Sequence, residues 1–512
     1  ELTVGVNNNL ALDPKFTDAA IGDYTLQETS PCINTGADTD APLDLVRNPR
    51  KYNGSLPDMG CYEFQGEPVA TELIVSFAPT VAYGLNELDT TFNATVIGAR
   101  GASLACEWDF GDGSSVAYTA VQTVDHHYSA PGEYTVVLTC NDGFLTGVCT
   151  NTCIFVNSDD PVRYVNASCP TPKYPYTTPE TASHDFDVVW TMNPAPTEIH
   201  VGPGTYTVNP TKQVYVLDRA VKVIGDDPDS VYFYSSVDGS GKAVFTLNHA
   251  DALLSGIKLE CQNSGNWIAT PPGGIDIIGG TVSNVVVTKC ISHKAGSVSL
   301  RGPNARFVDS RMTQCRLASA GNGVLLISEG VADRVTVEGT TANYANLSCT
   351  GILLQGTNAV CRNSLITGNT CNGGSATDLK PAVRVTKGLL ENCTVVNNNA
   401  GNGGNAGVYI GSTDGVVRNC IIIGNKGADL STINVAAADA DCLANVSNSC
   451  SPDLTVGVNG NLTLDPVFTD AAHGDYSLQE TSPCINTGAD TDAPLDYVRN
   501  PRKYNGSLPD MG

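Results

Sequence analysis

The sequence has 512 residues, 41% of them hydrophobic and only 16% charged, and its 53 acidic and 28 basic residues give a formal net charge of −25. This balance argues against a nucleic-acid or anionic-membrane partner, because both need clusters of Lys and Arg. The length allows more than one core, and the many Gly, Asn, Thr and Ser residues favour β-rich, turn-rich structure. No run of eighteen apolar residues predicts a membrane-spanning helix.

The two ends of the chain carry nearly the same sequence. Residues 454–512 match residues 2–60 with an offset of 452, and six of the 59 aligned positions differ. The differing pairs are Asn8/Gly460, Ala11/Thr463, Lys15/Val467, Ile21/His473, Thr25/Ser477 and Leu45/Tyr497. Such similarity is typical of a tandem array. We therefore expect one 452-residue period plus a 60-residue overlap, within a longer polypeptide.

The eighteen cysteines include no C-x-x-C pair, which favours disulfides over zinc and therefore an oxidising, extracellular or cell-surface location. Eight N-x-S/T sequons are candidate glycosylation sites, although such sequons also arise by chance in a chain rich in Asn and Thr. They lie at Asn53, Asn93, Asn166, Asn346, Asn392, Asn445, Asn461 and Asn505.

Residues 1–66 alternate short apolar pieces with turn residues. The segments Gly22-Asp23-Tyr24, Ser30-Pro31-Cys32-Ile33-Asn34 and Pro57-Asp58-Met59-Gly60-Cys61 resemble the tail that closes many bacterial right-handed parallel β-helix domains. The resemblance implies that this tail covers the last coils of a preceding β-helix. Cys32 and Cys61 are the expected disulfide inside it, and by the repeat Cys484 is expected to pair with a cysteine beyond Gly512.

After a linker at residues 65–68, alternating strands are predicted to residue 158. The motif Trp108-Asp109-Phe110-Gly111-Asp112-Gly113, followed by His127-Tyr128 and Pro131-Gly132-Glu133-Tyr134, resembles the PKD domain, an immunoglobulin-like β-sandwich. We expect Trp108 in the core, a tight turn at residues 110–113 and a buried strand at residues 136–138. Two disulfides are expected here, with three connectivities open, among Cys106, Cys140, Cys149 and Cys153.

Residues 159–452 begin with Tyr164-Val165-Asn166 and Val201-Gly202-Pro203-Gly204-Thr205-Tyr206, which resemble the opening coils of pectin-lyase-like right-handed parallel β-helices. Short apolar strands then recur, starting at residues 256, 284, 310, 334, 363, 392 and 419. The irregular period in the twenties suits one coil of a β-helix.

Equivalent positions of successive coils carry Asn and Cys. Asn363, Asn392 and Asn419 are predicted to form a ladder in which each side-chain amide bonds the neighbouring coil. Cys393 and Cys420 also occupy equivalent positions, and stacked strands bring such residues just inside disulfide range. A disulfide and a pair of stacked free thiols both remain open.

Two carboxylate groups are spaced closely enough to bind Ca²⁺. They are Asp38, Asp40 and Asp44 in the tail, and Asp109 and Asp112 in the PKD-like motif. The alternative is that these carboxylates cap backbone N–H groups in turns. Calcium is therefore the single candidate cofactor.

Many pectin-lyase-like proteins cleave acidic polysaccharides, but their clustered catalytic residues are missing here. Asp226-Asp227 is isolated and predicts a turn, and a pair such as Asp309 and Arg334 is expected to be an ion pair between coils. The histidines form neither a metal triad nor a Ser-His-Asp set. We therefore expect no enzyme.

The sequence predicts an all-β chain: residues 1–66 as the cap of a preceding β-helix, 67–158 as an immunoglobulin-like sandwich, 159–452 as a right-handed parallel β-helix, and 453–512 as its cap. We expect a structural repeat unit of a giant extracellular filament, stalk or surface adhesin, with neighbouring repeats or identical subunits as partners. About eleven coils and one sandwich predict an axial repeat on the order of 90–100 Å. The alternative is a carbohydrate-binding or polysaccharide-degrading protein with a glycan partner.

Overall fold

The computed structural model describes residues 9–51, 55–66, 72–99, 104–119, 123–208, 214–235, 243–262, 273–292, 296–318, 322–342, 349–372, 380–401, 407–427, 434–503 and 507–512. The chain folds into two compact units, Glu1–Asp159 with Lys173–Pro175, and Asp160–Pro172 with Tyr176–Gly512. Nearly every element is a strand, which confirms the all-β prediction. No helix in these ranges is long and apolar enough to cross a membrane.

The N-terminal cap, residues 9–66, contains one short antiparallel hairpin. Strands β1 (Phe16–Asp18) and β2 (Asp23–Leu26) are joined by the 3-10 helix η2 (Ala19–Ile21), with Phe16 opposite Leu26. Gly22 ends the turn at φ 85°, a left-handed conformation that glycine adopts without strain. The rings of Phe16 and Tyr24 pack edge to face, with centroids 5.4 Å apart.

The predicted sandwich is present. Its strands are β3 (Ile74–Pro79), β4 (Tyr83–Leu85), β5 (Leu88–Ile97), β6 (Ala105–Asp109), β7 (Ser115–Thr119), β8 (Thr123–Tyr128), β9 (Gly132–Asn141) and β10 (Thr146–Asn157). They form a five-stranded sheet, β4-β10-β9-β6-β7, and a three-stranded sheet, β3-β5-β8. Trp108, Val136 and Leu138 are fully buried in the core, and Phe110 N–H donates to the Ser114 carbonyl across the tight turn. These positions confirm the sequence predictions for the motif.

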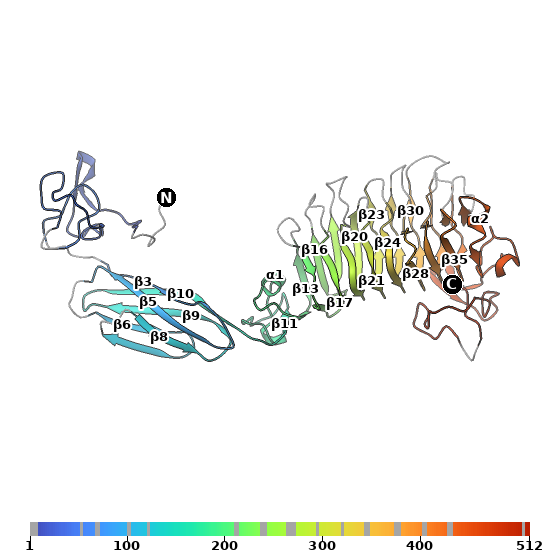
Figure 1. Cartoon of the computed structure of the whole chain (residues 1–512), viewed down its shortest axis with the longest axis horizontal. Coiled ribbons are helices and arrows are strands. Elements are labelled where there is room, and N and C mark those ends of the chain that lie inside the picture. The colour runs from blue at the N-terminus through green and yellow to red at the C-terminus, as the bar shows by residue number, and fades with distance from the viewer. Residues whose placement is uncertain are drawn as a thin grey trace. The chain divides into compact units, whose positions relative to one another are not determined.

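The second unit is a parallel β-helix, whose stacked coils are visible in Figure 1. A 16-stranded sheet contains β11 (Val162–Val165), β12 (Glu198–Val201), β14 (Tyr215–Leu217), β15 (Lys222–Gly225), β17 (Phe245–Ser255), β19 (Ile275–Ser283), β21 (Val298–Val308), β24 (Leu325–Asp333), β27 (Ile352–Leu354), β28 (Ala359–Arg362), β31 (Val383–Val385), β32 (Gly388–Glu391), β34 (Val408–Ile410), β35 (Gly415–Arg418), β37 (Val435–Ala437) and β38 (Val446–Ser447). A 12-stranded sheet contains β13 (Gly204–Thr207), β16 (Val231–Ser235), β18 (Lys258–Gln262), β20 (Val286–Ser292), β22 (Arg311–Thr313), β23 (Arg316–Leu317), β25 (Thr336–Glu338), β26 (Thr341–Ala342), β29 (Leu365–Thr367), β30 (Thr370–Cys371), β33 (Thr394–Val396) and β36 (Ile421–Ile423).

The recurring apolar segments of the sequence form one continuous ladder. They correspond to β18, β20, β22, β25, β29, β33 and β36, which are consecutive neighbours in the 12-stranded sheet. The two opening motifs likewise form β11, β12 and β13. The prediction of a coil every twenty to thirty residues is therefore confirmed, while the right-handed sense stays a prediction.

Aliphatic side chains stack in register along the interior of the β-helix. One such row is fully buried and consists of Ile277, Leu300, Ile327, Leu354, Val385 and Ile410. Burying a side chain of this size stabilises the fold by about 1.5–3 kcal/mol relative to leaving it exposed. Each coil thus contributes apolar area only when a neighbouring coil covers it.

The structure confirms the predicted asparagine ladder. Asn392 Nδ2 donates to Asn363 Oδ1 at 3.2 Å, and Asn419 Nδ2 donates to Asn392 Oδ1 at 3.0 Å. All three residues have left-handed backbones, with φ between 50° and 53°. Asparagine tolerates that conformation better than most residues, so one residue type serves both the turn and the ladder.

A second ladder, which sequence reasoning missed, lies six residues further along each coil. Asn369, Asn398 and Asn425 are buried, and each accepts a hydrogen bond from the backbone N–H of the coil before it. Asn434 does the same for Asn425 at 2.9 Å. These amides satisfy backbone groups that would otherwise be buried without partners.

Both ends of the β-helix are covered by irregular elements. At the start, η4 (Pro179–Thr181) precedes α1 (Phe186–Trp190), where buried Phe186 packs against the rings of Tyr215 and Phe233. At the other end, α2 (Ala440–Leu443) precedes the C-terminal cap, residues 453–512, which contains η6 (Val458–Gly460). Its hairpin of β39 (Phe468–Asp470), η7 (Ala471–His473) and β40 (Asp475–Leu478) repeats the register of the N-terminal cap.

Candidate interface between the C-terminal cap and the β-helix

One arginine of the C-terminal cap bonds to two coils of the β-helix. Arg502 Nε donates to Asn363 Oδ1 at 2.9 Å, and its Nη2 donates to the Asn392 carbonyl at 3.4 Å. The same guanidinium donates to the Asp510 and Gly512 carbonyls of its own cap. Burial lowers the pKa of Arg502, which reflects the cost of removing a charge from water. Its hydrogen bonds to the asparagine ladder offset that cost.

A second arginine completes an ion-pair network on the flank of the β-helix. Arg499 Nη2 lies 3.0 Å from Asp309 Oδ2, and Arg334 contacts the same carboxylate from the next coil at 2.6 Å. Burial raises the pKa of Asp309, but hydrogen bonds from Arg334 and Arg499 outweigh it and leave that pKa below its usual value. The predicted ion pair between coils, Asp309 with Arg334, is thus confirmed. Asp309 also pairs with Arg499 of the cap.

Asn419, the last residue of the asparagine ladder, forms hydrogen bonds with the backbone of the cap. Ala489 N–H donates to Asn419 Oδ1 at 2.7 Å, Asn419 Nδ2 donates to the Ala489 carbonyl at 2.8 Å, and Gly512 N–H donates to the Asn419 carbonyl at 2.7 Å. A Cβ on the neighbouring Gly488 would lie 2.8 Å from the Pro509 carbonyl oxygen. Only glycine therefore fits this close approach.

Tyrosines and apolar side chains fill much of the remaining contact. The hydroxyl of Tyr497 lies 2.6 Å from Thr336 Oγ1, and that of Tyr476 accepts from Asn397 Nδ2 at 2.9 Å. Beside them a cavity of about 410 Å³ lies between the two parts, lined among others by Leu365 and Thr394 of the β-helix and by Tyr476, Tyr497 and Arg502 of the cap. Asp475, Asp496 and Asp510 also line it.

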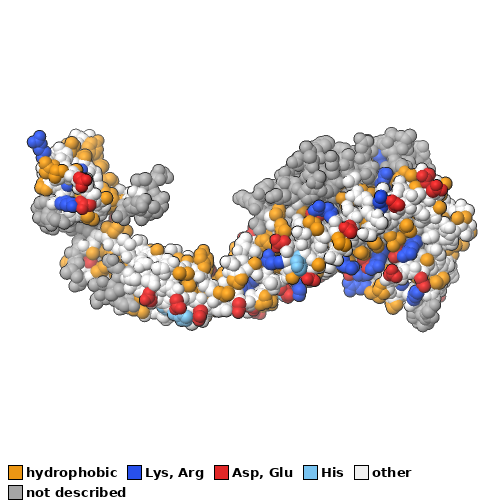
Figure 2. Space-filling model, in the orientation of Figure 1, with side chains coloured by type: hydrophobic (Ala, Val, Ile, Leu, Met, Phe, Trp, Pro, Cys, Tyr) orange, Lys and Arg blue, Asp and Glu red, His pale blue; other side chains and the backbone are white. Residues whose placement is uncertain are grey.

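The N-terminal cap keeps the residues that make this interface. Tyr24, Arg47, Arg50, Ala37 and Gly60 stand where the C-terminal cap has Tyr476, Arg499, Arg502, Ala489 and Gly512, whereas Leu45 replaces Tyr497. Several of its apolar side chains are exposed, including Ile21 (81%), Leu45 (65%) and Tyr24 (48%). Figure 2 shows hydrophobic side chains on the visible face of this cap.

Two of the candidate calcium ligands in the N-terminal cap form hydrogen bonds or an ion pair with residues of the same cap. Asp44 accepts from the N–H groups of Val46, Asn48 and Glu63, and Asp38 pairs with Lys51 at 2.6 Å. Asp40 is exposed.

The two carboxylates of the sandwich motif also act in turns. Asp109 and Asp112 accept from Gly111 N–H and Ser114 N–H, each at 2.9 Å, and Asp112 also contacts His126. In the part of the chain that the structure describes, no group of three or more His, Cys, Asp or Glu side chains gathers as in a metal site. Calcium binding stays a prediction.

Other carboxylates of the β-helix also pair with arginines of adjacent coils. Asp276 pairs with Arg301, Glu391 with Arg418, and Glu338 with Arg311. Asp227 accepts from Asp229 N–H at 2.7 Å, as expected for a turn. Figure 2 shows charges of both signs over the β-helix. These ion pairs link adjacent coils, and each of these carboxylates has an arginine as its partner.

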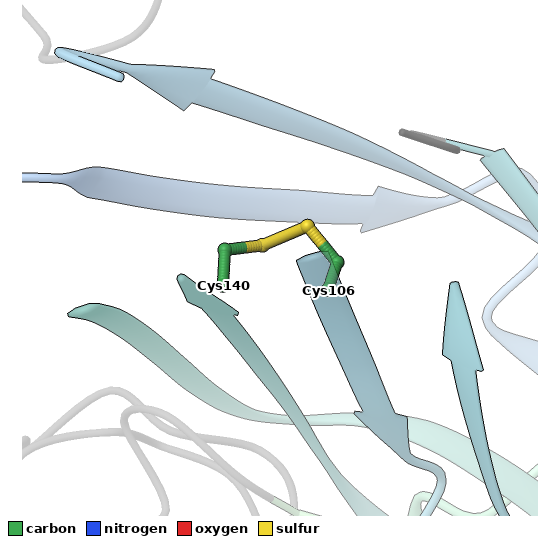
Figure 3. Close-up of a disulfide and its surroundings, with 2 residues drawn as sticks. All are labelled: Cys106 and Cys140. Carbon is green, nitrogen blue, oxygen red and sulfur yellow. A yellow bond between two sulfur atoms is a disulfide. The ribbon is translucent and has the colours of Figure 1, made fainter. Parts of the chain in front are cut away.

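The structure resolves one of the open disulfide pairings. Cys106 and Cys140 face each other on β6 and β9 and are bonded, as Figure 3 shows. Cys149 and Cys153 lie four residues apart on β10 and are unbonded. The pair predicted in the N-terminal cap, half-buried Cys32 and exposed Cys61, is also unbonded and stays a prediction.

The cysteines of the β-helix form stacks. Cys393 Sγ donates to the Cys361 carbonyl of the preceding coil at 3.7 Å, and Cys420 occupies the position aligned with Cys393 in the next coil. All three are fully buried and unbonded. The structure therefore places Cys393 and Cys420 together as predicted, and a disulfide between them stays a prediction.

The sequon asparagines lie in different environments. Asn93 is exposed, and Asn166 and Asn445 are half-buried. Asn392 and Asn461 are buried and use their amides in hydrogen bonds, Asn392 to the neighbouring coil and Asn461 to the Val446 carbonyl, which fits a structural role. Asn53, Asn346 and Asn505 lie outside the described residues.

Replacing Arg502 by Ala should loosen the C-terminal cap. The side-chain amide of Asn363 and the backbone carbonyls that accept hydrogen bonds from Arg502 would lose their charged donor. We expect a loss of about 2 kcal/mol in the stability of the docked cap. Hydrogen exchange of peptides from residues 461–512 should then accelerate about 30-fold. The matched control is Arg50→Ala, which changes the same residue of the N-terminal cap and should leave these peptides protected. Equal protection in both variants would contradict the assigned role.

Acid should weaken the same interface through Asp309. Since the folded-state pKa of Asp309 is depressed, its stabilising contribution is present above its ordinary pKa of about 3.9 and is lost as the pH falls through the folded-state value. Cap peptides, corrected for intrinsic exchange rates, should lose protection below pH about 4. Asp309→Asn should weaken protection at neutral pH and flatten this dependence. The control Asp251→Asn, at an exposed carboxylate of β17, should leave the profile unchanged.

Comparison with known proteins places one family within the chain. Residues 78–155 match the model of the PKD domain, and the match covers β4 to β9, most of β10 and the last two residues of β3. No curated protein matches the chain. The chain therefore contains a PKD domain followed by a parallel β-helix, a combination that suggests an extracellular adhesion or structural protein.

Proposed function

We propose that this chain is the structural repeat unit of a giant extracellular filament, stalk or surface adhesin. In this arrangement each unit consists of a PKD sandwich, a β-helix and a cap, joined head to tail. The cap of one unit closes the β-helix of the same unit and leads directly into the next sandwich. The function is mechanical or adhesive rather than catalytic.

A single observation carries the proposal: the chain contains two copies of one cap, and one of them is docked. The C-terminal cap binds the flank of the β-helix through Arg499, Arg502 and the backbone around Ala489. The N-terminal cap retains the corresponding residues and exposes Phe16 and Tyr24, whose counterparts Phe468 and Tyr476 are half-buried in the docked cap. We infer that residues 9–66 are the cap of a preceding β-helix with a similar flank.

The charges of the β-helix favour a spacer over a catalyst. Asp276, Asp309, Asp333, Glu338 and Glu391 each pair with an arginine. A general acid or base needs a carboxylate that is free to exchange a proton with substrate. We therefore propose that the chain is not an enzyme. The acidic balance of the sequence fits a soluble surface of an extracellular protein.

The proposal predicts that residues 1–452 assemble into fibres. Without residues 453–512 the flank of the β-helix is uncovered, and the N-terminal cap of another copy carries the residues that bind it. Such head-to-tail contacts do not close and therefore propagate. Electron microscopy should reveal fibres with an axial repeat on the order of 90–100 Å.

The 512-residue chain and one variant serve as controls. The 512-residue chain has its own flank covered, so it should stay monomeric, and small amounts of it should shorten the fibres of residues 1–452 by blocking one end. Arg50→Ala in residues 1–452 should shift the sample from fibres to monomers in sedimentation. Folded monomers of unmodified residues 1–452, with native far-UV circular dichroism, would contradict the proposal.

The cavity at the interface favours carbohydrate binding as a second candidate function. Tyrosines, carboxylates and Arg502 line it, and aromatic rings with polar neighbours suit a sugar ring. Titration of the chain with oligogalacturonides should then give saturable binding that Tyr476→Ala weakens about tenfold, whereas the matched Tyr24→Ala leaves binding unchanged. Absence of binding by the intact chain would remove this candidate.

A further inference from the structure

Cys450 is held in place by the last coil of the β-helix. Its backbone forms parallel bridges to Ile421 on one side and to Leu462 on the other. Cys450 N–H donates to the Cys420 carbonyl at 2.8 Å, and Ile422 N–H donates to the Cys450 carbonyl at 2.9 Å. The ladder therefore fixes the direction in which the Cys450 side chain leaves the backbone.

Cys484 reaches the same place from the C-terminal cap. Its N–H donates to Ser482 Oγ at 3.1 Å, and its carbonyl accepts from Met511 N–H at 3.0 Å. Cys450 and Cys484 are both fully buried and belong to one apolar cluster with Ile421 and Met511. The two thiols share a hydrogen bond, which raises the pKa of Cys450 and lowers that of Cys484. The two cysteines, which are unbonded in this structure, therefore lie in the same buried cluster although they come from separate parts of the chain.

We propose that Cys450 and Cys484 form a disulfide that fastens the C-terminal cap to the last coil of the β-helix. This pairing replaces the expectation that Cys484 bonds to a cysteine beyond Gly512. The bond adds a covalent link to the contacts of Arg499 and Arg502, so that the cap stays tethered to the last coil even where screening or protonation of the ion pairs loosens its other contacts.

The oxidant is a disulfide of an extracytoplasmic thiol oxidoreductase or of oxidised glutathione. The Cys484 thiolate first attacks one sulfur of that disulfide, and the released oxidant thiolate takes up the proton that Cys484 lost. The Cys450 thiolate then attacks the Cys484 sulfur of the mixed disulfide and displaces the second oxidant thiolate, which takes up the Cys450 proton. One S–S bond breaks and one forms, and two electrons pass from the protein to the oxidant.

The N-terminal cap contains a cysteine equivalent to Cys484. Cys32 stands where the C-terminal cap has Cys484, and its backbone makes the same hydrogen bonds to Ser30 and Met59. The partner Cys450 lies 34 residues before Cys484, a distance that from Cys32 leads outside this sequence. Cys32 is therefore the attachment point for the equivalent cysteine of a preceding β-helix. This second step rests on the proposed function, whereas the bond between Cys450 and Cys484 does not.

Peptide mapping of the intact chain, secreted from an oxidising compartment, tests the proposal. Free thiols are alkylated in denaturant without reductant, and the chain is cleaved before aspartates. We expect the peptides that begin at Asp441 and Asp475 to be recovered linked and to separate on reduction, with fragmentation assigning the bond to Cys450 rather than Cys442. The peptide that begins at Asp23 should carry an alkylated Cys32. Because it contains Thr25 where the other copy has Ser477, mass distinguishes the two copies.

Matched variants separate the outcomes. Cys484→Ser should abolish the linked species and leave Cys450 alkylated, whereas Cys32→Ser and Cys442→Ser should leave it intact. The link between Cys106 and Cys140 in the same digest reports that oxidation was sufficient. With that link present, alkylated Cys450 and Cys484 would overturn the proposed bond. Recovery of Cys32 linked to Cys61 would overturn only the assignment for the N-terminal cap. Neither result depends on whether residues 1–452 form fibres.

Discussion

The open end of a parallel β-helix is the constraint on which the rest of this structure depends. Each coil satisfies its backbone groups by bonding the coils before and after it, so the last coil has an unpaired edge. Here Cys450 of the last coil pairs with Leu462 of the cap, while the rest of the cap lies along the flank, where its Gly512 N–H bonds the Asn419 carbonyl of the preceding coil. The difference between the two caps fits this constraint, because Phe16 and Tyr24 are exposed whereas Phe468 and Tyr476 of the docked cap are half-buried.

The asparagine ladders link the interior of the β-helix to its cap. Within the coils, Asn363, Asn392 and Asn419 bond one another and hold left-handed turns. At the flank the same three residues bond Arg502, Thr491 and Ala489 of the cap. The repeat that orders the coils thus also supplies a periodic row of amides and carbonyls. A cap with correctly spaced donors recognises that row instead of any single side chain.

Most of what could be predicted from the sequence repeats along the β-helix or belongs to the motif of the sandwich, whereas single long-range contacts could not be predicted. The strand ladder recurs in successive coils and the first asparagine ladder spans three of them, and the second ladder lies six residues later in each, so its spacing could also have been recognised in the sequence. Arg499, Arg502 and Cys450 occur once in the docked unit and contact residues from 34 to more than 150 positions away. No local pattern marks such a contact. For the same reason the repeat led to an expected partner for Cys484 beyond Gly512 and gave no indication of Cys450, the partner that we propose.

The differences between the two caps indicate what their β-helices share. The hydroxyl groups of Ser477 and Thr25 each donate a hydrogen bond of 2.6 Å to the aspartate two residues earlier. The difference between Ser and Thr therefore preserves the hairpin. Val467 and Lys15 have nearly the same left-handed φ, 54° and 51°. Among the contacts described above, only Tyr497 has lost its counterpart, because Leu45 has no hydroxyl to bond a residue in the place of Thr336. On the proposed tandem arrangement, the β-helix that receives the N-terminal cap therefore presents the same asparagine and aspartate flank, with an apolar side chain where this one has Thr336.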